Sequence, residues 1–154
     1  MAYENICKQR NQKIVSCSII KRSAGRSAVA AAAYRSGAKL TNEWDGMTHD
    51  YTRKGGIIHA EIMLPAHAPP EFADRSILWN SVEQIDKARD SQLAREIEAA
   101  LPRELSGEQQ LALVRAYVKD NFVDKGKFCS YFCASFPSIH AKKPPVFHAG
   151  RLFA

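Results

Sequence analysis

A short basic turn that leads into a helix carrying a tyrosine is the part of this sequence best suited to chemistry. The turn and its flanks contain three cationic side chains, Lys21, Arg22 and Arg26. A glycine-containing turn before a helix presents free N–H groups and the positive end of the helix dipole to an anion. Arginines add charge-assisted hydrogen bonds to phosphate. The segment therefore predicts a site for a phosphate group.

Tyr34 lies two helical turns further on and is followed by Arg35. A tyrosine hydroxyl can attack a phosphodiester when the phenol is deprotonated or when a metal ion activates the phosphate. The covalent product would be a phosphotyrosine link to a nucleic-acid strand. The alternative is that Tyr34 is a half-buried aromatic residue with its hydroxyl at the rim, and spacing alone favours this alternative.

The first half of the chain reads as a strand, a helix and a second strand. β-Branched residues predict a strand over residues 14–21, and Ser27 can cap a helix over residues 28–35. Residues 38–55 are turn-rich and fit a surface loop or a short ribbon. Alternation predicts a strand over residues 57–64, and one face of it holds four apolar residues: Ile58, Ala60, Ile62 and Leu64.

The second half is dominated by helix patterns. Apolar spacing predicts a helix over residues 71–89, with Trp79 in the core. Residues 92–101 fit either a strand or a helix. Ser106 and Gln109 have capping-box spacing at the start of a helix over residues 106–122. Residues 127–154 fit no element cleanly. Strands separated by long helices indicate a single α+β or α/β domain.

Charge is distributed unevenly along the 154 residues, whose formal net charge is +6. Residues 1–39 hold eight Lys or Arg and one acid, residues 127–154 hold four and none, and residues 40–126 are acidic overall. This asymmetry points to a nucleic-acid partner, although a solvated basic arm is the alternative. No apolar run approaches the ~18 residues of a membrane span, and no signal sequence opens the chain. We therefore expect a cytoplasmic protein without a membrane partner.

Five stretches resemble the MobA/MobL family of plasmid mobilisation relaxases. The likeness runs in register over about residues 14–126. The stretches are Arg22–Gly37, Leu40–Gly56, Glu61–Pro65, Phe72–Asn80 and Gln92–Pro102.

The resemblance implies an α+β relaxase fold, in which helices flank a central antiparallel sheet. It implies that Tyr34 attacks the scissile phosphate of origin-of-transfer DNA and stays attached to the 5′ end. Glu96 matches an acidic residue of the family and would act as a base or support the reacting groups. Mg²⁺ or Mn²⁺ would be the cofactor. The partners would be single-stranded or melted origin DNA and accessory proteins of the relaxosome.

DNA contacts are expected from residues around the tyrosine. Lys21, Arg22, Arg26 and Arg35 would give salt-dependent DNA affinity if they face one groove. Trp44 lies in the turn-rich segment, where its ring could stack on a base.

The ends of the chain depart from the family. The family's metal pattern is Ile-His, seven residues, then His-x-His. His140 and His148 have that spacing, but Gly150 stands where the third histidine should be. Either both histidines are ligands of a weakened site, or the tail is an out-of-frame or degraded ending and the spacing is coincidence, which we favour. We expect a divergent arm over residues 1–13, an incomplete relaxase-like domain over 14–126, and a divergent tail over 127–154 that a frameshift would explain.

Two functions follow. The first is a relaxase fragment that nicks one strand through a tyrosine–phosphodiester intermediate, with activity reduced by the incomplete metal cluster. The second is a non-catalytic DNA-binding remnant or the product of a truncated gene.

Overall fold

A five-stranded antiparallel sheet forms the centre of the protein. The computed structural model describes residues 15–85, 87–99, 101, 105–134 and 146–149. The strand order is β1-β5-β7-β6-β4, and every neighbouring pair is antiparallel. The strands are β1 (Val15–Lys21), β4 (Ile57–Met63), β5 (Gln92–Ala99), β6 (Cys129–Ala134) and β7 (Val146–Ala149).

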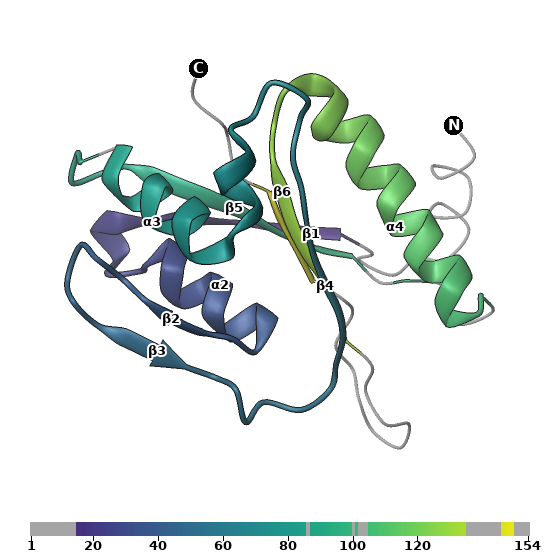
Figure 1. The fold of residues 1–154 in the computed structure, drawn as a ribbon, viewed down its shortest axis with the longest axis horizontal. Helices are drawn as coiled ribbons and strands as arrows, with labels where there is room; N and C mark the ends of the chain where they lie inside the picture. Colours follow the sequence, from purple (N-terminus) through teal and green to yellow (C-terminus); the bar gives the residue numbers. More distant parts are fainter. Residues whose placement is uncertain (1–14, 86, 100, 102–104, 135–145, 150–154) are drawn as a thin grey trace.

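Helices cover both faces of this sheet. On one side lie α2 (Ala28–Ser36) and α3 (Arg75–Ile85), and on the other lies α4 (Gly107–Asn121), as Figure 1 shows. A two-stranded ribbon of β2 (Lys39–Thr41) and β3 (Thr48–Asp50) lies beside α2. The predicted α+β class, an antiparallel sheet flanked by helices, is confirmed. Among the described residues, every helix is too short or too polar to cross a bilayer.

The core is divided between the two faces. Ile20 of β1, Val29 of α2 and Leu78 of α3 are buried together. Trp79, 1% exposed, belongs to the same cluster and confirms the prediction for that residue. On the other face, Val114 and Val118 of α4 pack against Ile97 and Met63. This arrangement follows from the alternation of side chains along each strand.

The helix boundaries follow from local capping. The Ser27 hydroxyl accepts a hydrogen bond from Ala30 N–H at the start of α2, and Gly37 ends the helix with a φ of 63°. The predicted capping box of Ser106 and Gln109 is present at the start of α4. The predicted helix over residues 71–89 is shorter than expected. A 3₁₀ turn, η2 (Pro70–Ala73), comes first, and the Asp74 carboxylate then accepts from the N–H groups that open α3.

Strand pairing decides one open prediction and corrects another. Residues 92–99 form a strand rather than a helix, because β5 pairs with β1 along its length. The common apolar face predicted for β4 is wrong at Ile58, which is 68% exposed. A register shift lies between Ile57 and His59, and such a bulge interrupts the alternation.

The expectation that residues 127–154 contain no element is wrong for two segments. β6 and β7 occupy the middle of the sheet, between β5 and β4. They pair with each other, and each also pairs with a strand far away in sequence, β6 with β4 and β7 with β5, which local patterns could not identify.

Candidate functional site

A cleft of about 360 Å³ lies where the start of α2 faces β5. Its lining includes four residues singled out from the sequence: Arg26, Tyr34, Arg35 and Glu96. Ala30 and Ala31 form its floor on the helix side, where small side chains leave room above the helix. Residues from two distant parts of the chain therefore share one solvent-facing cavity.

Tyr34 is 46% exposed and its ring is bordered by cations. The Lys54 Nζ atom lies 3.6 Å from the ring centroid, and the Arg35 guanidinium carbon lies 5.6 Å from it. Lys54 Nζ also donates a 2.7 Å hydrogen bond to the Tyr34 carbonyl oxygen. The Tyr51 ring meets the Tyr34 ring edge-on at 5.2 Å. The phenol is thus held at the surface in a cationic environment.

Glu96 holds the two arginines of the cleft. Its side chain is nearly buried, and it accepts hydrogen bonds from Arg26 Nη2 at 3.2 Å and from Arg35 Nε at 2.8 Å. Arg35 also pairs with Glu98 at 3.2 Å, and Ser18 Oγ donates to Glu96 at 3.2 Å. Both carboxylate oxygens of Glu96 therefore have guanidinium partners, and Glu96 fixes where these cations point.

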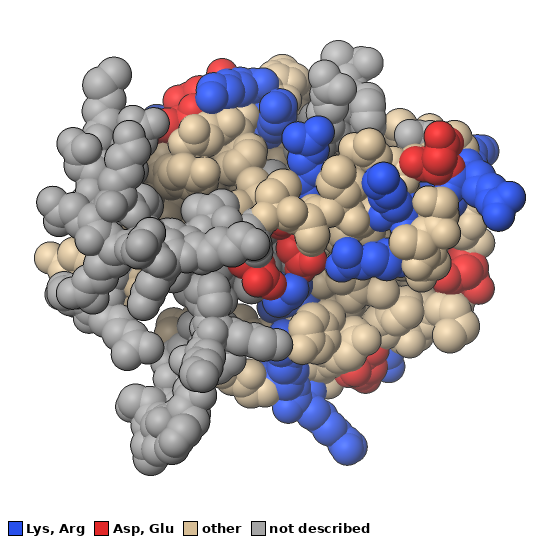
Figure 2. All heavy atoms as spheres, turned by 180° about the vertical axis from the view of Figure 1, so that it is seen from behind, with Lys and Arg blue, Asp and Glu red and all other residues tan. Residues whose placement is uncertain are grey.

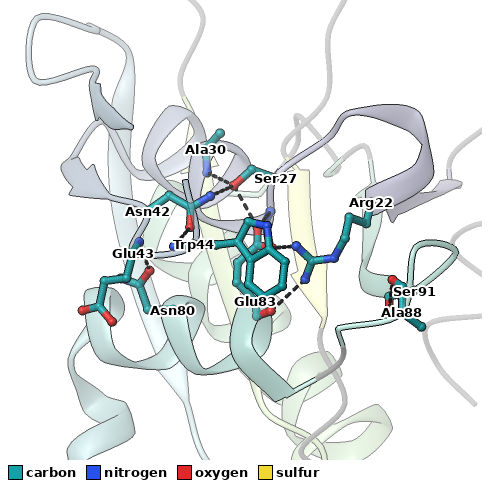
Figure 3. A network of polar contacts seen from close by, with 11 residues as sticks. Arg22, Ser27, Ala30, Asn42, Glu43, Trp44, Asn80, Glu83, Ala88 and Ser91 are labelled. Atoms are coloured by element: carbon teal, nitrogen blue, oxygen red, sulfur yellow. Dashed lines mark hydrogen bonds and ion pairs between the residues drawn. The ribbon is translucent and has the colours of Figure 1, made fainter. Parts of the chain in front are cut away.

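The start of α2 is not open to an anion in the way the sequence suggested. The Glu83 carboxylate of α3 accepts from Ala28 N–H at 2.6 Å and from the Ser27 hydroxyl at 2.8 Å (Figure 3). Ser27 itself caps Ala30 N–H. The expected phosphate position at these N–H groups is wrong, because a buried carboxylate of the protein already occupies it.

Arg22 lies outside the cleft. Its Nη1 atom forms an ion pair with Glu83 at 3.2 Å, and its guanidinium lies over the Trp44 ring, 4.4 Å from the centroid (Figure 3). Lys21 is exposed at the end of β1. The structure therefore brings Arg26 and Arg35 to Tyr34, and it places Arg22 with Trp44 on a neighbouring surface.

Positive charge is interrupted by acidic side chains on the face shown in Figure 2, over the described residues. From behind, Lys and Arg side chains alternate with Asp and Glu over the part of that face formed by described residues (Figure 2). Cationic character is concentrated locally around Tyr34.

The described residues do not fit a divalent cation at this site. His140 lies outside the described residues, and the backbone of His148 pairs with Glu96 on one side and Ser130 on the other. Glu96 already has two arginine partners, whose charge opposes a metal ion. Within the described ranges there is no group of three or more His, Cys, Asp or Glu able to hold an ion.

Lys54, Tyr51 and Glu83 were missed by the sequence analysis. Each is more than fifteen residues from the group it contacts: Lys54 and Tyr51 from Tyr34, and Glu83 from Ser27. Lys54 lies in a stretch that carries the family resemblance, but no pattern of spacing assigned it a partner. Only the folded arrangement shows these contacts.

Comparison with known proteins agrees with the predicted family. A model of the family described as MobA/MobL matches residues 26–150 and so extends past residue 126, where the sequence resemblance ended. The chain is 48% identical over 121 residues to "Conjugal transfer protein TraA" of Rhizobium radiobacter, covering 72% of this chain and 11% of the relative. It is 52% identical over 100 residues to "Mobilization protein MobL" of Acidithiobacillus ferridurans, covering 65% of this chain and 26% of that relative. It therefore spans a small part of these relatives.

A solved structure has the same fold. It comes from work titled "Molecular Basis of Vancomycin Resistance Transfer in Staphylococcus aureus". Its TM-score is 0.80 at 25% identity, and the match covers 90% of this chain and 69% of that one.

Proposed function

The chain belongs to the MobA/MobL family, and from this we propose that its cleft binds an unpaired strand of origin-of-transfer DNA, which Tyr34 attacks. The observation that carries the proposal is the exposed phenol of Tyr34 beside three cations: Arg26, Arg35 and Lys54. A basic cleft with an exposed nucleophile is the arrangement that phosphodiester transfer requires.

In the proposed reaction the Tyr34 oxygen forms a bond to phosphorus, and the bond from phosphorus to the 3′ oxygen breaks. The phenol proton passes to a base or to water, and the leaving oxygen takes up a proton. The 5′ end remains attached to Tyr34. No atom is gained or lost, and the phosphodiester is conserved in the covalent intermediate.

The side chains around Tyr34 have separate roles in this proposal. Guanidinium N–H groups of Arg26 and Arg35 would contact the nonbridging oxygens and offset the charge that builds up on them. Lys54 would fix the ring and add positive charge beside the attacking oxygen. Glu96 would act as a positioning residue, since it already orients both arginines.

A divalent ion, Mg²⁺ or Mn²⁺, stays a prediction from the family, as do His140 and His148 as ligands. When bound, such an ion would neutralise phosphate charge. Relaxosome accessory proteins are likewise predicted from the family.

A nicking assay tests the proposal. The protein is incubated with supercoiled origin DNA and Mg²⁺ or Mn²⁺, and covalent adducts are resolved on a denaturing gel. The wild-type protein should form an adduct that Tyr34→Phe loses, with DNA affinity changed by no more than about threefold because phosphate contacts supply most of it. Tyr51→Phe is the matched control, since it removes a neighbouring hydroxyl and keeps the ring contact. An undiminished adduct in Tyr34→Phe rules out Tyr34 as the nucleophile.

The second candidate function is DNA binding without cleavage. It is favoured by one observation: Glu96, which the family resemblance suggests as a base, has both oxygens engaged by arginines. Specific binding of origin DNA with no adduct in the same assay would support this function.

A further inference from the structure

Trp44 is an exposed aromatic side chain on a turn that the fold holds firmly. Its side chain belongs to the turn between β2 and β3 and is 47% exposed. The backbone N–H of Trp44 donates to Asn42 Oδ1 at 3.0 Å, and the buried Asn42 side chain donates to Ser27 Oγ at 3.2 Å. Glu43 N–H donates to Asn80 Oδ1 at 2.9 Å. The turn is therefore attached to both α2 and α3.

One face of the indole is already covered. The Arg22 guanidinium lies 4.4 Å from the ring centroid and is fixed in turn by Glu83 (Figure 3). An aromatic ring held in this way loses little conformational freedom when a flat ligand stacks on it. Because Trp44 is exposed and yet fixed by these contacts, it is better suited to binding a ligand than to packing in the core.

This ring lies next to the cleft. Ser27 lines the cleft and also accepts the hydrogen bond from Asn42, two residues before Trp44. Arg22, which covers the indole, and Arg26, which lines the cleft, are separated by a single tight turn. A strand that leaves the cleft across this turn would run toward Arg22 and the indole that it covers.

We propose that the indole of Trp44, with Arg22 against its other face, is a subsite that stacks one unpaired base of the strand in the cleft. This inference rests on the proposed function. Stacking on tryptophan accepts any base because every base has a π-face. Bases in a duplex already stack on each other, so the subsite selects an unpaired strand. Arg26, which lines the cleft, suits a phosphate on the cleft side of that base.

Oligonucleotides with and without bases provide the test. Affinities are measured for a fluorescein-labelled dT20 and for a 20-mer of the same charge in which every sugar lacks its base. Trp44→Ala should weaken binding of dT20 by about 5- to 100-fold and leave the abasic 20-mer unchanged. Trp44→Phe keeps a ring and should retain most of the dT20 affinity. Ile77→Ala, which removes an equally exposed apolar side chain from α3, is the matched control and should change neither.

Tryptophan fluorescence gives a second readout. Trp79 is 1% exposed, so the emission accessible to a ligand comes from Trp44. The emission should be quenched by dT20 and not by the abasic 20-mer. Equal loss of affinity for both 20-mers, or no loss for either, overturns the stacking subsite while leaving the proposed function intact. Failure of the wild-type protein to bind either 20-mer at low salt also overturns the subsite, because a stacking site that accepts any base would retain dT20. The proposed function is decided separately, by the adduct with origin DNA.

Discussion

Tyr34 combines solvent exposure with fixed surroundings, because the groups that hold its ring come from other segments. Lys54 supplies a cation above the ring and Tyr51 an edge contact, while Arg35 follows Tyr34 in the chain. Opposite the helix, Glu96 keeps two guanidiniums at the cleft. At the residue scale, the candidate site is therefore an exposed phenol with cations beside it, two of which are held by Glu96.

Lys54 should titrate at a lower pH than an ordinary lysine. Burial, and to a smaller extent the charge of Arg35, lowers the pKa of the Lys54 ammonium below its ordinary value of 10.5. Between the lowered pKa and 10.5, the folded state binds fewer protons than the unfolded state, so stability should rise with pH across that window. An NMR titration of the lysine side chains measures the value. In Arg35→Gln the pKa of Lys54 should rise but stay below 10.5, because burial is the larger cause. A Lys54 pKa at or above 10.5 in the unaltered protein contradicts this account.

Two described cysteines should differ sharply in reactivity. Burial raises the pKa of the Cys129 thiol to about 12, whereas Cys17 is exposed. Because the thiolate is the reactive form, iodoacetamide at pH 8 should modify Cys17 and leave Cys129 intact in the folded protein. Peptide mass spectrometry distinguishes the two sites. Unfolding in guanidinium should make both react, and equal labelling of both in the native protein would be inconsistent with a buried Cys129.

At the scale of elements, Glu83 joins α3 to the start of α2. Its buried carboxylate accepts from Ala28 N–H and Ser27, and pairs with Arg22. A carboxylate is favourable at a helix N-terminus because the helix dipole is positive there. The same contact keeps the Arg22 guanidinium against Trp44. One acidic residue of α3 therefore orders the turn between β1 and α2.

Removing this carboxylate should cost considerable stability. Glu83→Ala removes the carboxylate that pairs with Arg22, whose side chain is 16% exposed, and removes the acceptor of two donors at the start of α2. We expect a loss of roughly 3–5 kcal/mol in the free energy of unfolding, measured by urea denaturation. Glu43→Ala is the control, because the Glu43 side chain makes an exposed contact with Gln84. This substitution should change the free energy of unfolding by less than about 0.5 kcal/mol. Similar losses in both variants would show that Glu83 has no special structural role.

At the scale of the whole molecule, we expect the cations beside the cleft to contribute most of the electrostatic attraction for a strand. The formal net charge is +6, yet cationic and anionic side chains alternate over the face in Figure 2. If the cleft binds a strand as proposed, its affinity should depend on the few cations around Tyr34. The opposite face of the sheet, covered by α4, should contribute little.

Salt dependence should identify these cations. Arg26→Gln should reduce the slope of log affinity against log salt for dT20 by about 0.7, the contribution of one phosphate contact to an unpaired strand. Lys119→Gln alters a residue near the end of α4 and should leave the slope unchanged. The measurement is fluorescence anisotropy between low and moderate salt. An equal effect of the two substitutions would indicate nonspecific attraction by the net charge.

The sequence by itself determined the features that depend on neighbours in the chain. The caps of α2 and α4 involve hydrogen bonds across three residues, so Ser27, Ser106 and Gln109 were sufficient to predict them. The family was also identified from sequence and is confirmed by the match to residues 26–150. The roles assigned to Tyr34 and Glu96 stay predictions.

Only the tertiary structure decided which residues meet. Residues 92–99 became a strand because β1 pairs with them, and that pairing faces Glu96 toward Arg26 and Arg35, more than sixty residues away. Tertiary packing also brings Lys54 over the Tyr34 ring and the Glu83 carboxylate to the start of α2. Such contacts depend on how the elements pack, and the local spacing of residues carries no information about packing across the molecule.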